Sequence, residues 1–503
     1  LFLSRSFPGS APRIEGHRSS PNGAMSAVSA RGAHGAHVTR STHVASTSRV
    51  SRSAAVVPPR GRGGAARLVA TTVSASSDTT ATKATATTHD VVIIGGGLSG
   101  LCAAVSLQSA GVDFLLLESS DGVGGRLRTD VVDGFLLDRG FAIFLTGYPE
   151  AKRVLDYDEL QLKNFYAGAD VFLDGSFHRL ADPLRHPLDA VKSLSPSHPI
   201  GSVLDKVLVG LVRLQSLWGD CYEQLEAPET SIALRLKELN FSDQMVDSFF
   251  RPFMSGIFFD PKLGTSSRLF TFVMRMLATG QNCLPVDGIG AVGEQLLKKL
   301  PSGSVVLNCE VVGRDDVVGD DGFTMTKLTT NDGAEIFARK AIIVATAGPD
   351  ARRLTGEQLD TSPSAPENSA VGTTCLYFAI HGSAPYETPI LYLDGSKKPA
   401  GGRLVNNCCF PSTVSRSYAP EGKALASVSI VGVPALSDEA LELKVRTELQ
   451  DWFGKREVTE KKWTHLKTYR VPFAQPGQQV PTDLNRSCRL KDRRTFVCGD
   501  HRS

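Results

Sequence analysis

A glycine-rich turn carries the residues with the clearest chemistry in this chain of 503 residues. Gly95, Gly97 and Gly100 follow the β-branched residues 91–94 at the spacing G-x-G-x-x-G. The first glycine permits a tight turn, the second lets a pyrophosphate approach the backbone, and the third lets helix and strand pack closely. The N–H groups that begin the following helix form an anion site. They belong to Gly97, Leu98, Ser99 and Gly100.

An acidic residue completes this dinucleotide signal. Residues 114–117, Phe-Leu-Leu-Leu, predict a buried strand, and Glu118 lies at its end. A carboxylate there can accept both hydroxyls of an adenosine ribose and repels a 2′-phosphate. A membrane span is the competing interpretation of the uncharged residues 91–112, but five glycines and a Ser-Gln-Ser cluster interrupt them. We therefore predict strand, turn, helix, strand and acid, the context that a dinucleotide fingerprint requires.

A second glycine pair follows six to seven residues after Glu118. Gly124 and Gly125 let the backbone pass close to a cofactor, and Arg126 brings a cation to its phosphates. Residues 137–141, Leu-Asp-Arg-Gly-Phe, offer another close approach at Gly140.

Together these motifs resemble the flavin-containing amine oxidase and carotenoid desaturase superfamily. The family pattern is a glycine fingerprint, a ribose-binding Glu and then Gly-Gly-Arg, and the resemblance implies FAD as the cofactor. Relatives often carry a basic residue two positions after the Glu, where this chain has Ser120. A phosphate contact of the family is therefore not expected at that position.

Later segments resemble other cofactor elements of the same family. In relatives, a backbone amide and carbonyl in the strand that matches residues 305–312 hold the adenine, which implies Val311. The strand 341–347 ends beside the cofactor in relatives, at Ala345. Residues 496–500 resemble the final flavin motif, in which Asp500 meets the ribityl chain and N–H groups near Gly499 meet a phosphate. A helix follows that motif in relatives, so we expect the sequence to be truncated after Ser503.

The order of these motifs predicts an α/β protein. We expect a Rossmann-like FAD/NAD(P)-binding domain at residues 89–150, 284–350 and 471–503. A mixed α+β substrate domain is interleaved with it, at residues 151–283 and 351–470.

The first 89 residues have a different composition from the rest. They hold eleven Lys or Arg residues, two acids, and many Ser, Thr, Ala and Gly. Such a segment buries too little apolar surface to fold, and its composition is typical of an organelle transit peptide. We expect residues 1–88 to be a disordered leader directing the protein to the chloroplast, with the mitochondrion as the alternative. A nucleic-acid-binding tail is the competing reading. The first methionine is Met25, so an alternative is that residues 1–24 are not translated.

The remaining chain is mildly acidic, with 44 basic and 50 acidic residues. That balance gives no general attraction to nucleic acid. The nine cysteines show no C-x-x-C spacing, so we expect buried thiols and no metal site. Cys408 and Cys409 are neighbours in an expected strand and should point to opposite faces.

Two apolar stretches dominate the expected substrate domain. One is an amphipathic helix, for which we expect core packing, with a substrate tunnel or a peripheral membrane contact as the alternative. Its apolar face holds Val203, Val207, Leu208, Leu211, Leu214 and Trp218. The segment 249–280 is dense in Phe and Met and suits either an adaptable apolar wall or a helical core.

Further elements follow from local signals. We predict strands at 371–380 and 424–433 and an acidic hairpin loop at 315–321. Ser437 should cap a helix that Gly454 ends. Its inward face should hold Leu441, Val445, Leu449 and Trp452.

Three classes of function remain open. The first is an FAD oxidoreductase that removes hydride from a hydrophobic substrate, an isoprenoid or tetrapyrrole, desaturating or isomerising it, with oxygen or a quinone as electron acceptor. The second is a flavin amine oxidase that produces hydrogen peroxide. Many such enzymes carry a lysine in a substrate-domain strand, whereas the comparable residues 372–378 have none. The third is a non-enzymatic escort protein of the same fold, in which flavin motifs are usually degraded.

No catalytic residue can be assigned from the sequence. Histidine is the side chain that most readily exchanges protons near neutral pH, but a lone histidine is more often structural. The candidates are His178, His186, His381 and His465.

Overall fold

The computed structural model describes residues 87–319, 322–356, 370–396, 402–484 and 486–502. The expected leader therefore lies outside the described residues, except for Thr87 and Thr88, which begin strand β1 (Thr87–Ile94). Among the helices that are described, none has both the length and the apolar character of a membrane span.

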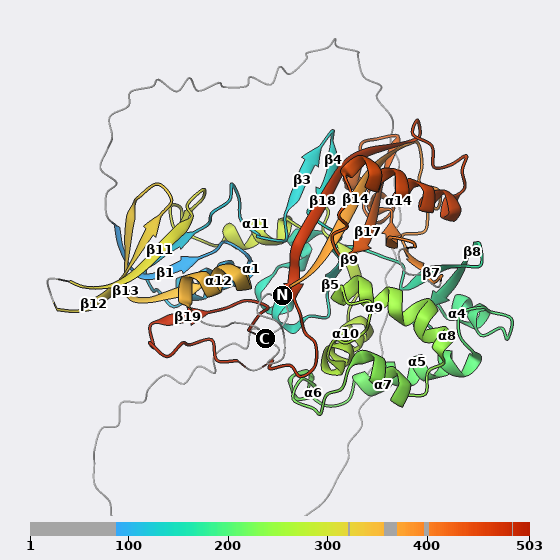
Figure 1. Cartoon of the computed structure of the whole chain (residues 1–503), viewed down its shortest axis with the longest axis horizontal. Coiled ribbons are helices and arrows are strands. Elements are labelled where there is room, and N and C mark those ends of the chain that lie inside the picture. Colours follow the sequence, from blue (N-terminus) through green and yellow to red (C-terminus); the bar gives the residue numbers. More distant parts are fainter. Residues whose placement is uncertain (1–86, 320–321, 357–369, 397–401, 485, 503) are drawn as a thin grey trace, which may run out of the picture. The chain divides into compact units, whose positions relative to one another are not determined.

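A seven-stranded sheet, the first sheet, is formed by residues far apart in the sequence (Figure 1). Its order is β10-β2-β1-β13-β12-β11, and β19 pairs with β13. The pairs from β10 to β13, and β13 with β19, are parallel, whereas β11 and β12 are antiparallel. The bounds are β2 Phe114–Leu117, β10 Val305–Val306, β11 Val311–Val318, β12 Thr324–Thr330, β13 Glu335–Val344 and β19 Thr495–Val497. The helices beside these strands in the sequence are α1 Leu98–Ser109, α11 Ala291–Leu297 and α12 Gly348–Thr355. This parallel arrangement confirms the predicted Rossmann-like fold class.

The second sheet also has seven strands, in the order β18-β14-β17-β16-β15-β7-β8. Their bounds are β7 Gly168–Leu173, β8 Ser176–Ala181, β14 Ala370–His381, β15 Leu391–Asp394, β16 Val405–Cys409, β17 Lys423–Val431 and β18 Trp463–Pro476. Cys408 and Cys409 belong to two different core clusters, so they face opposite sides of this sheet as predicted.

Helix α14 (Asp438–Phe453) follows its sequence signals closely. The Ser437 hydroxyl accepts a hydrogen bond from the Ala440 N–H at the start, and Gly454 ends the helix with a positive φ. The four residues predicted to face inward are all buried: Leu441, Val445, Leu449 and Trp452.

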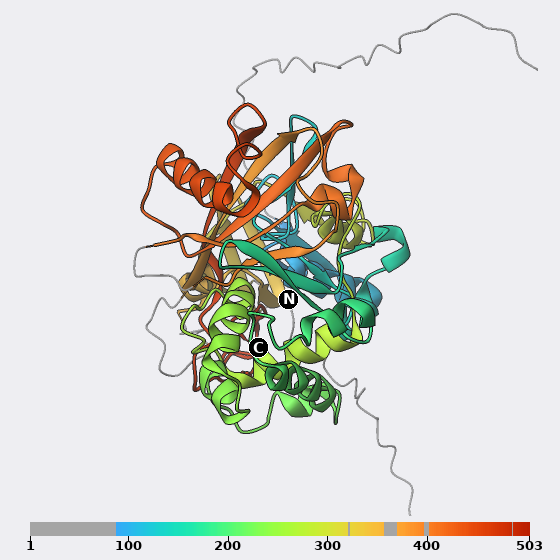
Figure 2. The same cartoon turned by 90° about the vertical axis from the view of Figure 1, so that its right-hand side faces the viewer.

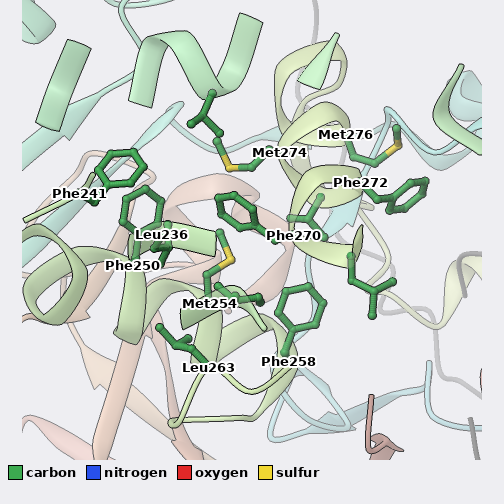
Figure 3. Packing of buried hydrophobic residues seen from close by; sticks show 14 of the residues in the cluster. Leu236, Phe241, Phe250, Met254, Phe258, Leu263, Phe270, Phe272, Met274 and Met276 are labelled. Carbon is green, nitrogen blue, oxygen red and sulfur yellow. The ribbon is translucent and has the colours of Figure 1, made fainter. Parts of the chain in front are cut away.

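Helices gather between residues 187 and 279, the green elements of Figure 2. They are α4 Pro187–Ser193, α5 Val203–Ser216, α6 Cys221–Gln224, α7 Ile232–Glu238, α8 Asp243–Met245, the π-helix η1 Val246–Phe250, α9 Arg251–Phe258 and α10 Ser267–Thr279. Figure 3 shows the core that they share, in which Phe250, Met254 and Phe270 pack together. The Phe- and Met-rich segment is therefore largely core.

Short elements join these regions. Two small sheets consist of β3 (Thr129–Val132) with β4 (Phe135–Asp138), and of β9 (Asn282–Leu284) between β5 (Phe144–Leu145) and β6 (Lys163–Asn164). The short helices are α2 Pro149–Val154, α3 Tyr157–Leu160, α13 Pro411–Val414 and the 3-10 helix η2 Arg416–Tyr418.

The expectation that the apolar face of α5 is core was wrong. Leu211 and Leu214 are 54% and 53% exposed, and Trp218 beyond the helix is 75% exposed. The side that faces inward is mixed, with Asp205, Val212 and Ser216 buried. Asp205 is buried and accepts hydrogen bonds from Ser202 and Ser242, while Arg213 binds Asp182.

The predicted strand 305–312 is two strands in different places. β10 lies beside β2, and β11 pairs with β12 at the far edge of the sheet. Asn308 has a positive φ of 54°, which turns the chain between them, and the Cys309 N–H donates to the Glu118 carbonyl. The predicted acidic loop also begins later, because residues 315–318 belong to β11.

Helix α14 provides a test of the core assignment. We expect Leu449→Ala to lower the free energy of unfolding by about 2–5 kcal/mol, because Leu449 is fully buried and its loss leaves a cavity. Leu443→Ala in the same helix should change it by less than about 0.5 kcal/mol, because Leu443 is 61% exposed. Denaturant unfolding of both variants measures the difference. Equal losses would contradict the orientation of the helix.

Candidate cofactor site

Four parallel strands of the first sheet end at one edge. Ile94 of β1 pairs with Leu117 of β2 and Val344 of β13, and Val344 pairs with Val497 of β19. The residues that follow these strand ends are therefore neighbours. Ligands of open α/β sheets bind outside the carboxyl ends of the strands. The predicted residues at this edge are Gly95, Glu118, Ala345, Gly499 and Asp500.

The three fingerprint glycines meet different surroundings. A Cβ on Gly95 would lie 2.8 Å from the Ala345 carbonyl oxygen, and a Cβ on Gly100 would lie 1.9 Å from the Gly95 oxygen. A Cβ on Gly97 would meet no atom within 4 Å. Gly95 and Gly100 thus permit close packing, whereas Gly97 faces open space that a cofactor can fill.

The N-terminus of α1 has the features of an anion site. Gly97 is its N-cap, and no side chain caps the helix or places an acid in the first turn. The helix dipole and the N–H groups of Leu98 and Ser99 are therefore directed at the space beside Gly97.

Glu118 is held firmly at the end of β2. One carboxylate oxygen accepts the Gly96 N–H at 2.6 Å, and the other accepts the Ser120 N–H and hydroxyl at 2.9 and 2.6 Å. Each oxygen keeps lone-pair capacity for a ribose hydroxyl. The position that holds a basic residue in relatives is therefore used here to orient the acid, a role for Ser120 that the sequence did not suggest.

The second glycine pair lies against the first. The Gly124 N–H donates to the Gly96 carbonyl at 2.8 Å, and a Cβ on Gly125 would lie 3.2 Å from Cα of Gly97. Both residues have positive φ, which glycine adopts without strain. The Gly-Gly turn therefore borders the same open space as the α1 N-terminus.

Arg126 is paired with Asp500, the acid of the final motif. Their Nη1 and Oδ2 atoms are 2.7 Å apart, and Arg126 also donates to the Ala474 carbonyl. Burial tends to raise the pKa of Asp500, but His501 and Arg126 outweigh it and hold that pKa below its usual range. Asp500 is therefore an anion near neutral pH.

His501 is a buried residue that sequence reasoning missed. It is 1% exposed, its Nδ1 lies 3.8 Å from Asp500, and neither ring nitrogen has a hydrogen-bond partner among the described residues. Its ring packs against the backbone of Gly499. The only sequence signal was its place directly after Gly-Asp.

Strand β18 of the second sheet contacts loops near the cofactor site. A Cβ on Gly140 would meet Val471 at 3.8 Å, and a Cβ on Gly348 would meet Phe473 at 3.5 Å. Gly140 has a φ of 106°, which allows the close approach predicted for it. The segment that holds Ala474 against Arg126 thus also touches the loops after β4 and β13.

Val311 lies at the start of β11, buried in the core of the first sheet. Its carbonyl accepts long hydrogen bonds from Arg353 at 3.4 and 3.5 Å. The contact between Cys309 and Glu118 places this segment next to the end of β2. Its role toward adenine stays a prediction.

The four candidate histidines have local partners. His186 stacks on Tyr166 with ring centroids 3.8 Å apart, and His178 bonds to the Leu173 carbonyl. His381 and His465 bond to threonine hydroxyls of β18. These contacts indicate structural roles. Among the described residues, no group of three or more His, Cys, Asp or Glu could hold a metal ion.

Asp138 supports the loop that presents Gly140. It is buried and accepts hydrogen bonds from the Thr129 hydroxyl, the Ile289 N–H and the Tyr418 hydroxyl. Burial raises the pKa of Asp138 to about 6, against the opposing effect of these hydrogen bonds. The carboxyl ties β3, β4 and the turn before α11 together.

A family model described as flavin containing amine oxidoreductase matches residues 98–503. The 4,4'-diapolycopene oxygenase of Methylomonas sp is 37% identical over 95 residues, which cover 16% of this chain and 19% of that protein. Protoporphyrinogen oxidase 2 of Arabidopsis thaliana is 25% identical over 173 residues, which cover 33% and 32% of the two chains. The matched segments thus span a third or less of these relatives.

A solved structure shows the same fold. Wild-type putrescine oxidase with bound putrescine superposes with a TM-score of 0.57 and 15% identity, over 82% of this chain and 93% of that one. The matching family confirms the predicted flavin cofactor, FAD. The open space beside Gly97, the uncapped α1 N-terminus and the oriented Glu118 carboxylate fit its phosphates and ribose.

The fingerprint glycines give a matched pair of variants. Gly97→Ala should cost about 1 kcal/mol of stability or less and lower the affinity for FAD about tenfold or more, because its methyl group enters the open space. Gly100→Ala should cost about 3 kcal/mol or more, because its methyl group meets the Gly95 oxygen. Thermal unfolding and flavin content separate the two effects. Normal FAD binding by Gly97→Ala would refute the assignment of the phosphate path.

Asp138 should make stability depend on pH. Because its folded pKa lies above the value of about 3.9 in an unfolded chain, the folded state binds this proton more tightly. The contribution of Asp138 to stability therefore falls as pH rises from about 4 to 7, by about 2 kcal/mol. The difference in unfolding free energy between the unaltered chain and Asp138→Asn should shrink accordingly.

Asp121→Asn is the control for that measurement. Arg128 lowers the pKa of this exposed acid, so the difference for Asp121→Asn should change in the opposite direction. A difference for Asp138→Asn that stays constant or widens with rising pH would contradict a raised pKa.

Proposed function

Because the chain belongs to the flavin-containing amine oxidoreductase family, we propose that it is an FAD-dependent oxidoreductase that removes hydride from a hydrophobic substrate, desaturating or isomerising it. The observation that carries the substrate class is a cavity of about 250 Å³ in the helical region. Its walls come from α4, α5, α8, η1, α9 and α10 and from strands β7, β8 and β9.

The cavity wall is largely apolar. Flexible and aromatic side chains that fit irregular apolar molecules line it, among them Phe249, Phe253, Met274 and Leu277. Residues 249–280, which were predicted to form either an apolar wall or a helical core, thus contribute to both.

The charges in the lining favour this substrate over an amine. Asp182 is the one acidic residue among the lining residues, and it is bound to Arg185 and Arg213. A cationic amine would find no free carboxylate there and would meet basic side chains instead. An apolar substrate, with or without an acidic group, meets no such electrostatic repulsion.

The cavity also reaches an element close to the cofactor loops. Asn282 lines it and pairs with Leu145 of β5, which follows Gly140 by five residues. FAD, when bound, supplies the hydride acceptor. The chain's own residues then enclose the substrate, exclude water with Phe and Met side chains, and orient the carbon that loses hydride.

The intact flavin motifs speak against an escort protein. Gly97 faces open space and Glu118 is oriented by three hydrogen bonds, arrangements that a cofactor-free relative would have no reason to keep.

A substitution that fills the cavity tests this proposal. Gly210 lies in the lining, and a Cβ there meets no atom within 4 Å, so helix α5 should accept a larger residue. We expect Gly210→Leu to lower kcat/KM about tenfold or more for an apolar polyene or a reduced tetrapyrrole, with flavin content unchanged. Gly210→Ala is the control and should keep activity.

The screen that precedes this test follows loss of flavin absorbance without oxygen, with polyenes, reduced tetrapyrroles, polyamines and monoamines as candidate substrates. Reduction by amines alone, with hydrogen peroxide formed when air is admitted, would overturn the proposal. So would equal activity of Gly210→Leu and Gly210→Ala on an apolar substrate.

A further inference from the structure

We propose that the hydrophobic molecule held in the helical cavity carries a carboxylate, and that Lys206 of α5 binds this group. The cavity lining has three basic side chains, Lys206, Arg185 and Arg213, and one acidic side chain, Asp182. The lining thus has a formal excess of two positive charges, although the rest of it is largely apolar. The identity of this molecule as substrate rests on the proposed function, whereas its binding does not.

The two arginines are already held by the fold. Arg185 lies 2.8 Å from one oxygen of Asp182, and Arg213 binds the other oxygen. Their remaining contacts are with carbonyls at the end of α10, where Arg185 donates to Gly280 at 2.6 Å and Arg213 donates to Ala278 at 3.4 Å. This cluster therefore fixes α10 against α5, and its donors are largely occupied.

Lys206 has no comparable partner. It is partly buried and forms no ion pair with any of the described residues. Its Nζ donates one long hydrogen bond, of 3.4 Å, to the Gly201 carbonyl, and an ammonium group has three donors. The neighbouring carboxylate of Asp205 instead accepts hydrogen bonds from the hydroxyls of Ser202 and Ser242. Lys206 thus retains donors for an anion in the cavity.

Burial makes a carboxylate the favoured partner of Lys206. The pKa of Lys206 is lowered by burial, against the opposing effect of Asp205. A neutral apolar molecule in the cavity would displace water from the ammonium group and provide no replacement for it. A carboxylate replaces that water with a charge-assisted hydrogen bond and stabilises the charged form of the lysine.

The inner face of α5 also orients such a molecule. Lys206, Val209, Gly210 and Arg213 all line the cavity and follow the spacing of one helix face. Lys206 and Arg213 are about 10 Å apart along the helix axis, and the two residues between them are uncharged. The Arg213 end adjoins the end of α10, which precedes Asn282 of β9 near the cofactor loops. A carboxylate at Lys206 therefore directs the apolar part of the molecule toward that end.

Binding of cis-parinaric acid, a fluorescent polyene acid, and of its methyl ester to the FAD-loaded full chain tests this site. We expect the acid to bind about tenfold or more tightly than the ester. Lys206→Met should remove this advantage by weakening binding of the acid alone, and Lys206→Arg should retain it. Lys192→Met is the control and should change neither affinity, because Lys192 is outside the lining, 78% exposed and paired with Asp189.

Three outcomes would overturn the proposal. The first is equal affinity of the unaltered chain for acid and ester, or no binding of the acid. The second is a Lys206→Met variant that keeps the advantage, which would assign the carboxylate to the arginine cluster. The third is unchanged binding by Gly210→Leu, which should weaken both ligands and would otherwise place them outside the cavity. Thermal unfolding of Lys206→Met should be nearly unchanged, because one long hydrogen bond is lost.

The binding measurement is independent of turnover. A chain that binds the acid through Lys206 but whose flavin is reduced by amines alone would contradict the proposed reaction and leave the carboxylate site standing. A chain that removes hydride from apolar substrates but binds acid and ester equally would contradict the carboxylate site alone.

Discussion

The approach of Gly100 to the carbonyl oxygen of Gly95 is the constraint on which the cofactor site depends. A Cβ at residue 100 would lie 1.9 Å from that oxygen, so helix α1 can begin over the end of β1 only if the residue is glycine. The same turn rests on the Ala345 carbonyl, at the end of the strand that pairs with β19. One backbone contact thus fixes the anion site relative to the segment that carries Asp500. The ion pair of Asp500 with Arg126 then connects the C-terminal segment to the Gly-Gly turn beside the cofactor position.

The elements that the sequence predicted well have local signals. β2 agrees residue for residue with the predicted strand 114–117, because four apolar residues lie between a helix end and an acid. α14 begins after Ser437 and ends at Gly454, because capping depends on neighbours within one turn. The flavin family followed from motif spacing for a similar reason. Gly95 and Gly100 permit close backbone packing, and Gly97 leaves open space, so the spacing reflects local geometry.

The features that the sequence did not reveal depend on contacts between distant segments. The spacing of apolar residues in α5 gives the width of a face but not the direction in which it points. That direction is set by Asp182 and Ser242, which hold Arg213 and Asp205 inward from outside the helix. The break between β10 and β11 depends likewise on the bond from Cys309 to Glu118. Buried His501 lacked any periodic signal, and Ser120 gained its role only through the position of Glu118.

The orientation of α5 links the cavity to the surface. Asp205 accepts hydrogen bonds from Ser202 and Ser242, and Arg213 forms an ion pair with Asp182, so turning the helix over would break both sets of contacts. A small rotation of α5 therefore cannot bury its apolar outer face. Contiguous apolar surface in water is unfavourable unless something covers it. The same two helices line the largely apolar cavity with their inner side.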